Sequence, residues 1–169
     1  MPDKNTIRLK NYLNNFFEGT LTAVAVTPGM LVEQTSAGVY QKHSTSGGNA
    51  LPPMFPIENV NFGGGVNDNY AASAKAQIWI PQRGDEVYAI LADGQNVAIN
   101  DPLESNGAGL LQKHIADVES FESNEAGAIT VLPNNIVAVA LEAIDISDSS
   151  GLESSGPLGY DKRIKIRII

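Results

Sequence analysis

The chain of 169 residues contains no cysteine. This excludes disulfides, thiolate metal sites and cysteine nucleophiles together, and it fits assembly in a reducing cytoplasm. No apolar run approaches the roughly 18 residues of a membrane-spanning helix. The first ten residues, MPDKNTIRLK, also lack the apolar core of a secretory signal. We therefore expect a soluble chain with no membrane partner.

Residues that usually carry catalysis are scarce. Only two histidines occur, His43 and His114, and a zinc site would need carboxylates to complete its ligand set. The chain has no Gly-x-Ser-x-Gly elbow and no EF-hand phrase, and no Lys-Ser/Thr follows Gly63-Gly64-Gly65 as a phosphate loop would require. We expect no enzyme activity, no catalytic residue, no cofactor and no bound metal.

Positive charge is also scarce. Eleven Lys and Arg residues stand against nineteen Asp and Glu residues, which gives a formal net charge of -8. Residues 1–19 carry +1 and residues 162–169 carry +4, which leaves -13 for the body between them. Phosphate contacts need a contiguous basic surface, so we expect no nucleic-acid partner. The simplest interpretation of the acidic body is that it favours solubility. A more specific hypothesis is that the acidic body repels DNA while the basic ends contact another partner.

Residues 81–114 form the stretch around which the rest of the chain is arranged. Residues 86–91 are rich in β-branched and aromatic types, which predicts a strand. Arg83-Gly84-Asp85 could suggest a cell-adhesion ligand, but a tight turn leading into this strand explains it more simply.

The same stretch predicts a β-meander. Asp93-Gly94 is typical of a two-residue hairpin turn, which would pair residues 97–99 with the preceding strand. Pro102 would end that second strand, because proline cannot donate to a ladder. A third strand is expected over residues 110–114.

From residue 20 to the end, the sequence has the pattern of an all-β protein. We predict one mainly β domain over residues 20–169, a small antiparallel β-barrel or sandwich of roughly eight to ten strands. Residues 128–131 predict a strand, and the nearly all-apolar residues 136–143 predict one buried on both sides in a closed barrel. Isoleucines alternate with Lys and Arg in residues 162–169, which predicts a closing strand with a basic outer face.

Residues 1–19 differ from the rest in pattern. Their apolar residues recur at spacings of about three to four, as on one side of a helix, but several asparagines weaken helix formation. Two interpretations remain open: a short helix folded onto the core, or an N-terminal arm that orders only against a neighbouring surface. We favour the arm slightly.

Two further features suggest a contact between subunits. Spaced prolines in residues 51–57 disfavour a helix and predict an extended segment at a sheet edge, which could lie across a neighbour. Trp79 is the only tryptophan. Such a residue usually belongs to the core, but in an oligomer it is also a common interface anchor.

The order of these motifs resembles that of the head-decoration (capsid cement) proteins of tailed bacteriophages. The matching motifs are Gly84-Asp85-Glu86-Val87, a hairpin, Val97-Ala98-Ile99-Asn100, and the Ser-Asn-Gly-Ala-Gly-Leu-Leu run of residues 105–111. Pro28-Gly29-Met30-Leu31-Val32-Glu33 also fits a Pro-Gly, Leu-Val-Glu phrase near the start of that family. The resemblance covers roughly residues 20–169 and consists of turn signals and their spacing.

This resemblance implies a structural virion protein without catalytic residues. Such a protein binds the outer surface of an icosahedral phage head, stabilises it, and has the major capsid protein as its partner. The resemblance also implies a homotrimer, located on the capsid exterior after assembly in the host cytoplasm. The alternative from another class is a receptor- or glycan-binding β domain of a virion or bacterial surface, which would use the Ser/Gly loops and Trp79.

We assign two sets of contact residues as hypotheses. Capsid binding is assigned to Ile7, Arg8, Leu9, Tyr12, Leu13, Phe16 and Phe17. The subunit interface is assigned to Pro52, Pro53, Phe55 and Trp79. On these assignments, a chain lacking residues 2–18 should fold but lose capsid binding.

Overall fold

The computed structural model describes residues 5–114, 135–147 and 163–169. Within them the chain forms thirteen strands and a single 3-10 turn, η1 (Val60–Phe62), so the prediction of a mainly β fold is confirmed. None of the helical structure in these ranges has the length and apolarity to cross a membrane. The strand predicted at residues 128–131 lies outside the described residues.

The larger sheet has six strands. It comprises β1 (Arg8–Lys10), β7 (Glu86–Ile90), β13 (Arg163–Ile168), β11 (Ala138–Ala140), β9 (Pro102–Ser105) and β10 (Leu111–Lys113), in that spatial order. All of its strand pairs are antiparallel. Every residue of β7 is buried, so this strand is the centre of the fold.

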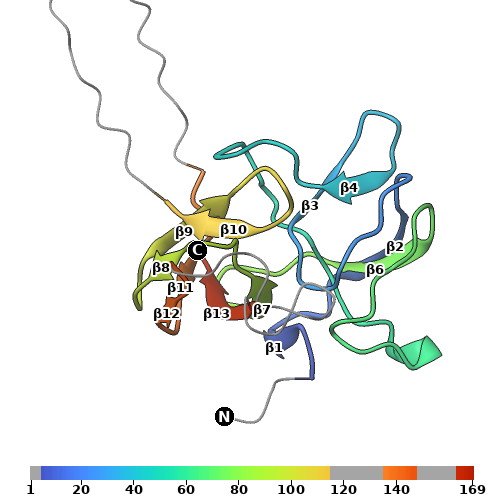
Figure 1. Cartoon of the computed structure of the whole chain (residues 1–169). Coiled ribbons are helices and arrows are strands. Elements are labelled where there is room, and N and C mark those ends of the chain that lie inside the picture. The colour runs from blue at the N-terminus through green and yellow to red at the C-terminus, as the bar shows by residue number, and fades with distance from the viewer. Residues whose placement is uncertain (1–4, 115–134, 148–162) are drawn as a thin grey trace, which may run out of the picture.

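Three smaller sheets complete the architecture. They are β2 (Phe16–Thr20) with β6 (Lys75–Trp79) and β5 (Phe55–Pro56), β3 (Val32–Gln34) with β4 (Tyr40–Lys42), and β8 (Asn96–Val97) with β12 (Ile144–Asp145). Figure 1 shows the larger sheet on the left, β2 and β6 on the right, and β3 with β4 above them. Phe55 and Trp79 share one buried apolar cluster with Val87 and Ile164 of the larger sheet, which gives a sandwich-like arrangement.

The described strands do not close into a barrel. The outer strands β1 and β10 stand at opposite ends of the sheet order. Ala138 and Ala140 of β11 are fully buried as predicted, but Val139 between them is half-buried. The sandwich of the prediction therefore fits this part of the chain, and the closed barrel does not.

The predicted meander is wrong in its pairing. β7 pairs with β1 and β13, whereas β8 pairs with β12. Pro102 begins β9 and does not end a strand, because proline is tolerated at the first position, where its missing N–H is not needed. The Asp93-Gly94 turn is present, with Gly94 at φ 75°, but the chain leaving it crosses to another sheet.

The last strand follows its predicted alternation with one exception. Ile164, Ile166 and Ile168 are buried, while Lys165 and Arg167 face outward. Arg163 was expected on the basic outer face but is only 2% exposed. Its guanidinium donates to the backbone oxygens of Val66 and Tyr88, so it holds neighbouring segments together inside the fold.

The N-terminal segment is neither a helix nor a separate arm between residues 5 and 19. β1 pairs with β7, and β2 pairs with β6 along its whole length. Ile7 is fully buried in the main core. The spacing that suggested a helical face instead arises from two short strands joined by the loop of residues 11–15.

Candidate functional site

Three large apolar side chains are exposed together on the loop between β1 and β2. Tyr12 is 64% exposed, Leu13 is 62% exposed and Phe16, at the start of β2, is 48% exposed. We call these three residues the N-terminal surface. Large apolar side chains that are exposed so close together in the chain make this segment a candidate interaction site.

A buried carboxylate fixes the position of this loop. Asp85 is fully buried, and its two oxygens accept hydrogen bonds from the backbone N–H of Tyr12 (2.9 Å) and of Gln82 (2.8 Å). At the other end of the loop, the Ile80 N–H donates to the Asn15 oxygen at 2.9 Å. Asp85 is thus part of a turn, as predicted, and its carboxylate is not exposed as a cell-adhesion ligand would require.

Cations lie beside the N-terminal surface. The Arg8 guanidinium is 5.6 Å from the ring centroid of Phe16, and the Lys10 ammonium is 5.3 Å from that of Tyr12. Such contacts keep a cation at an aromatic face while leaving both partners accessible. The surface therefore combines apolar area with positive charge, on a chain whose net charge is -8.

Glu86 connects this region to the basic face of β13. Its carboxylate accepts from Lys165 Nζ at 2.6 Å and from Arg167 Nη2 at 3.3 Å, and its strand position is opposite Lys10. The hydrogen bond from Lys165, followed by that from Arg167, holds the pKa of Glu86 below its ordinary value near 4.5, although partial burial raises it. The carboxylate is therefore charged at neutral pH and keeps the two cations in place.

The Glu86→Gln substitution should destabilise the protein at neutral pH by about 1 kcal/mol, because charge-assisted hydrogen bonds are lost and the cations are partly solvated. A lowered folded-state pKa contributes stability that is complete above the ordinary value of 4.5 and disappears as the pH falls through the lowered value. Denaturant unfolding of both proteins at a series of acid pH values should show that the difference in their free energies of unfolding shrinks as the pH falls below 4.5.

Glu18→Gln is the matched control, since Glu18 and its partner Lys75 are both more than half exposed. This substitution should change the free energy of unfolding by no more than about 0.5 kcal/mol at every pH. A pH-independent effect of Glu86→Gln would contradict the assigned ion pairs.

The structure divides the predicted capsid-binding set. Tyr12, Leu13 and Phe16 are exposed, as a contact requires. Ile7 is buried in the core, so its assignment to the contact is wrong for this fold. The remaining members, Arg8, Leu9 and Phe17, are half-buried. Phe17 packs against the Tyr40 ring at a centroid distance of 5.3 Å.

The predicted subunit interface is mostly internal. Phe55 and Trp79 are fully buried and occupy paired positions on β5 and β6. Pro53 is also buried, which leaves Pro52 as the exposed member of the set. These large apolar side chains fill the space between the sheets, so they cannot anchor a second subunit without the fold opening.

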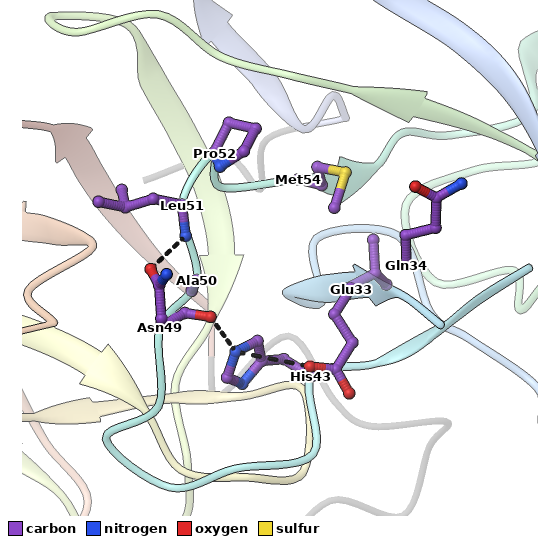
Figure 2. A pocket seen from close by; sticks show the side chains of 9 residues that line it. Glu33, Gln34, His43, Asn49, Ala50, Leu51, Pro52 and Met54 are labelled. Carbon is purple, nitrogen blue, oxygen red and sulfur yellow. Dashed lines mark hydrogen bonds and ion pairs between the residues drawn. The ribbon is translucent and has the colours of Figure 1, made fainter. Parts of the chain in front are cut away.

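A pocket of about 300 Å³ lies next to Pro52. Its lining comes from β3, from His43 just after β4, and from residues 49–52 and Met54. Figure 2 shows Glu33 and His43 at one end and Leu51, Pro52 and Met54 along the other side. Sequence reasoning missed this pocket, because its residues come from three separate segments with no motif spacing.

His43 is a structural histidine at the base of the pocket. The Gly107 N–H donates to Ser105 Oγ (3.1 Å), Ser105 Oγ lies 2.8 Å from His43 Nδ1, and His43 Nε2 lies 3.1 Å from the Asn49 oxygen. A neutral ring satisfies the whole series, with Nδ1 accepting and Nε2 donating. Ser105 is fully buried, so this Ser–His pair does not present a nucleophile to solvent.

The other histidine is paired at the edge of the larger sheet. His114 Nδ1 lies 2.6 Å from Glu104 Oε2, and Gln112 donates to the other Glu104 oxygen at 2.8 Å. Across the ranges that the structure describes, no three His, Cys, Asp or Glu side chains cluster as metal ligands.

No protein-family model matches this chain, and no curated protein matches it. Function must therefore be inferred from the N-terminal surface, the pocket and the motifs of the sequence.

Proposed function

We propose that the chain is a structural virion protein, a capsid decoration or cement protein that binds the outer surface of an icosahedral tailed-phage head and stabilises it. Its partner would be the major capsid protein, and its assembly a homotrimer. The observation that carries the proposal is the N-terminal surface, where Tyr12 and Leu13 are exposed on a loop anchored by Asp85 and Phe16 is exposed at the start of β2. The sequence resemblance supplies the kind of partner.

The proposed mechanism is mechanical. A site formed only in the expanded shell would bury the N-terminal surface, so binding lowers the free energy of that state relative to the others. Fully burying one such side chain contributes about 1.5–3 kcal/mol. Because only about half of the area of each of the three side chains is still exposed, roughly 3 kcal/mol per copy is a reasonable gain. Many copies then sum to strong resistance against rupture.

The charges next to the surface add a second contribution. Arg8 and Lys10 flank the aromatic rings, and Lys165 and Arg167 extend the positive region across β13. Carboxylates on the shell would complement these cations and speed association. Binding should therefore weaken as ionic strength rises.

The glycan-binding alternative loses its strongest support. It used Trp79 together with the Ser/Gly loops, and the Trp79 side chain has no exposed area. Only the Ser/Gly loops remain for it. A glycan array on the purified chain, set beside sedimentation with empty heads, separates the two functions.

The triple substitution Tyr12→Ser, Leu13→Ser and Phe16→Ser should weaken binding to expanded heads by about 100-fold, which corresponds to the loss of about 3 kcal/mol. The measurement is co-sedimentation with DNA-free heads assembled from the major capsid protein of the genome that encodes this chain. Analytical ultracentrifugation of the free chain tests the homotrimer separately.

The matched control is Val24→Ser, Val60→Ser and Phe62→Ser, which removes three other apolar side chains that are 50–88% exposed. This control should bind as well as the unmodified chain. Unchanged binding by the N-terminal variant, or no binding of the unmodified chain to expanded heads, would refute the proposal.

A further inference from the structure

The pocket beside β3 contains a carboxylate that hydrogen bonds hold in place and that pairs with no Lys or Arg side chain of the described residues. Glu33 Oε1 accepts hydrogen bonds from Gln41 Nε2 (2.8 Å), Ser44 Oγ (2.7 Å) and the Ser44 N–H (3.2 Å). Glu33 Oε2 has His43 Nε2 at 3.7 Å, which is longer than a hydrogen bond. This second carboxylate oxygen faces the His43 ring (Figure 2) and accepts no hydrogen bond from the described residues.

Glu33 is ionised at neutral pH. Burial raises its pKa, but the hydrogen bonds from Gln41 and Ser44, together with the electrostatic effect of the nearby His43, keep the pKa below its usual range. Glu33 is the only Asp, Glu, Lys or Arg side chain of the lining. Alternation along β4 places Gln41 beside Glu33 and sends Lys42 to the opposite face, so the neighbouring lysine does not compensate this charge.

Part of the remaining lining is apolar, while Gln34 and Asn49 add polar side chains to it. Leu51, Pro52 and Met54 line the side of the pocket across from Glu33 and His43 (Figure 2). Leu51 is 64% exposed at the rim, where it is accessible to the main chain of an approaching polypeptide. A group that fits this lining has an aliphatic stem for the walls and a cation for Glu33, and it enters from the rim.

We propose that this pocket binds a lysine or arginine side chain of a partner polypeptide, with its cation on Glu33 and its stem against Leu51, Pro52 and Met54. The ligand class follows from the combination of one carboxylate that has no Lys or Arg partner with the apolar part of the lining. This proposal is independent of head binding, because the isolated chain suffices to test it.

The test is a titration of the isotope-labelled chain, followed by NMR amide shifts at low salt. The probes are acetyl-Gly-Arg-Gly-amide and the same peptide with citrulline, which keeps the shape of arginine but carries no charge. The arginine peptide should shift the amides of Glu33, His43 and residues 49–52 and bind about tenfold more tightly than the citrulline peptide, since charge-assisted hydrogen bonds are about twice as strong as neutral ones.

Two variants of equal net charge locate the effect. Glu33→Gln should weaken the binding of the arginine peptide by about tenfold. Glu18→Gln removes a carboxylate that is paired with Lys75 outside the pocket, and it should leave the affinity for this peptide unchanged. Glutamine keeps the oxygen that accepts from Gln41 and Ser44, so the fold should persist. Leu51→Ser changes an exposed residue and should also weaken binding, which gives a readout independent of Glu33.

Several results would overturn the proposal. Equal affinity for the citrulline peptide would remove the charge recognition, and equal weakening by Glu18→Gln would reduce it to a general charge effect. Shifts confined to residues outside the pocket would move the site elsewhere. Tighter binding of free spermidine than of the arginine peptide, at the same amides, would identify a small polyamine as the ligand in place of a polypeptide.

Discussion

Replacing Trp79 with alanine is expected to lower the free energy of unfolding by about 3–5 kcal/mol. Trp79 is fully buried, and its strand position is opposite Phe16 on β2 and Phe55 on β5. Loss of the indole would leave a cavity between the sheets, and the flanking strands can collapse into it only partly. Because the substitution removes the only tryptophan, unfolding should be followed by circular dichroism in denaturant.

Trp79→Phe is the matched control and should cost well under half as much. It retains a ring at this position and removes the indole N–H, a buried donor for which the described residues provide no acceptor. A loss below about 1 kcal/mol for Trp79→Ala would contradict the central position of this residue. A change in oligomeric state without a loss of stability would restore its predicted role as an interface anchor.

Deleting residues 2–18 should abolish cooperative folding, contrary to the expectation from the sequence. The deletion removes β1, most of β2 and the buried Ile7. It also removes three hydrogen-bond donors to buried carboxylates. Asp85 loses the Tyr12 N–H, and Glu58 loses the Ile7 N–H and the Thr6 hydroxyl. Each such loss costs several kcal/mol, comparable to a large part of the total stability.

The measurement is a thermal unfolding curve together with the dispersion of amide signals in NMR. A shorter deletion of residues 2–4 keeps β1 and is the control, with an unfolding transition expected. A sharp transition for the longer deletion would show that the N-terminal strands are dispensable. Loss of head binding by that deletion would not identify the contact residues, whereas the triple serine substitution leaves the fold in place and does identify them.

The parts of the fold that could be predicted from the sequence are those set by local pattern. The alternation of isoleucine with Lys and Arg in β13 predicts which residues are inside, because successive side chains of a strand point to opposite faces. Pairing partners could not be predicted this way. β7 pairs with strands near both ends of the chain, and no local signal in residues 86–91 specifies them.

The same limit applies to the candidate sites. An apolar pattern in residues 7–17 indicated a contact, but it could not separate Ile7 from Leu13, since the difference between them depends on the pairing of β1 with β7. Arg163 matched its basic neighbours in type, and only the approach of Val66 and Tyr88 makes it internal. The pocket depends on three segments that meet only after folding.

The Asp85 anchor also bears on the entropy of recognition. A loop whose backbone is already held at Tyr12 and Asn15 has little conformational freedom left to lose when a partner covers it. Such a preorganised epitope should dock with nearly the same shape that it has in the free chain, and its association rate should be limited by diffusion and orientation more than by rearrangement.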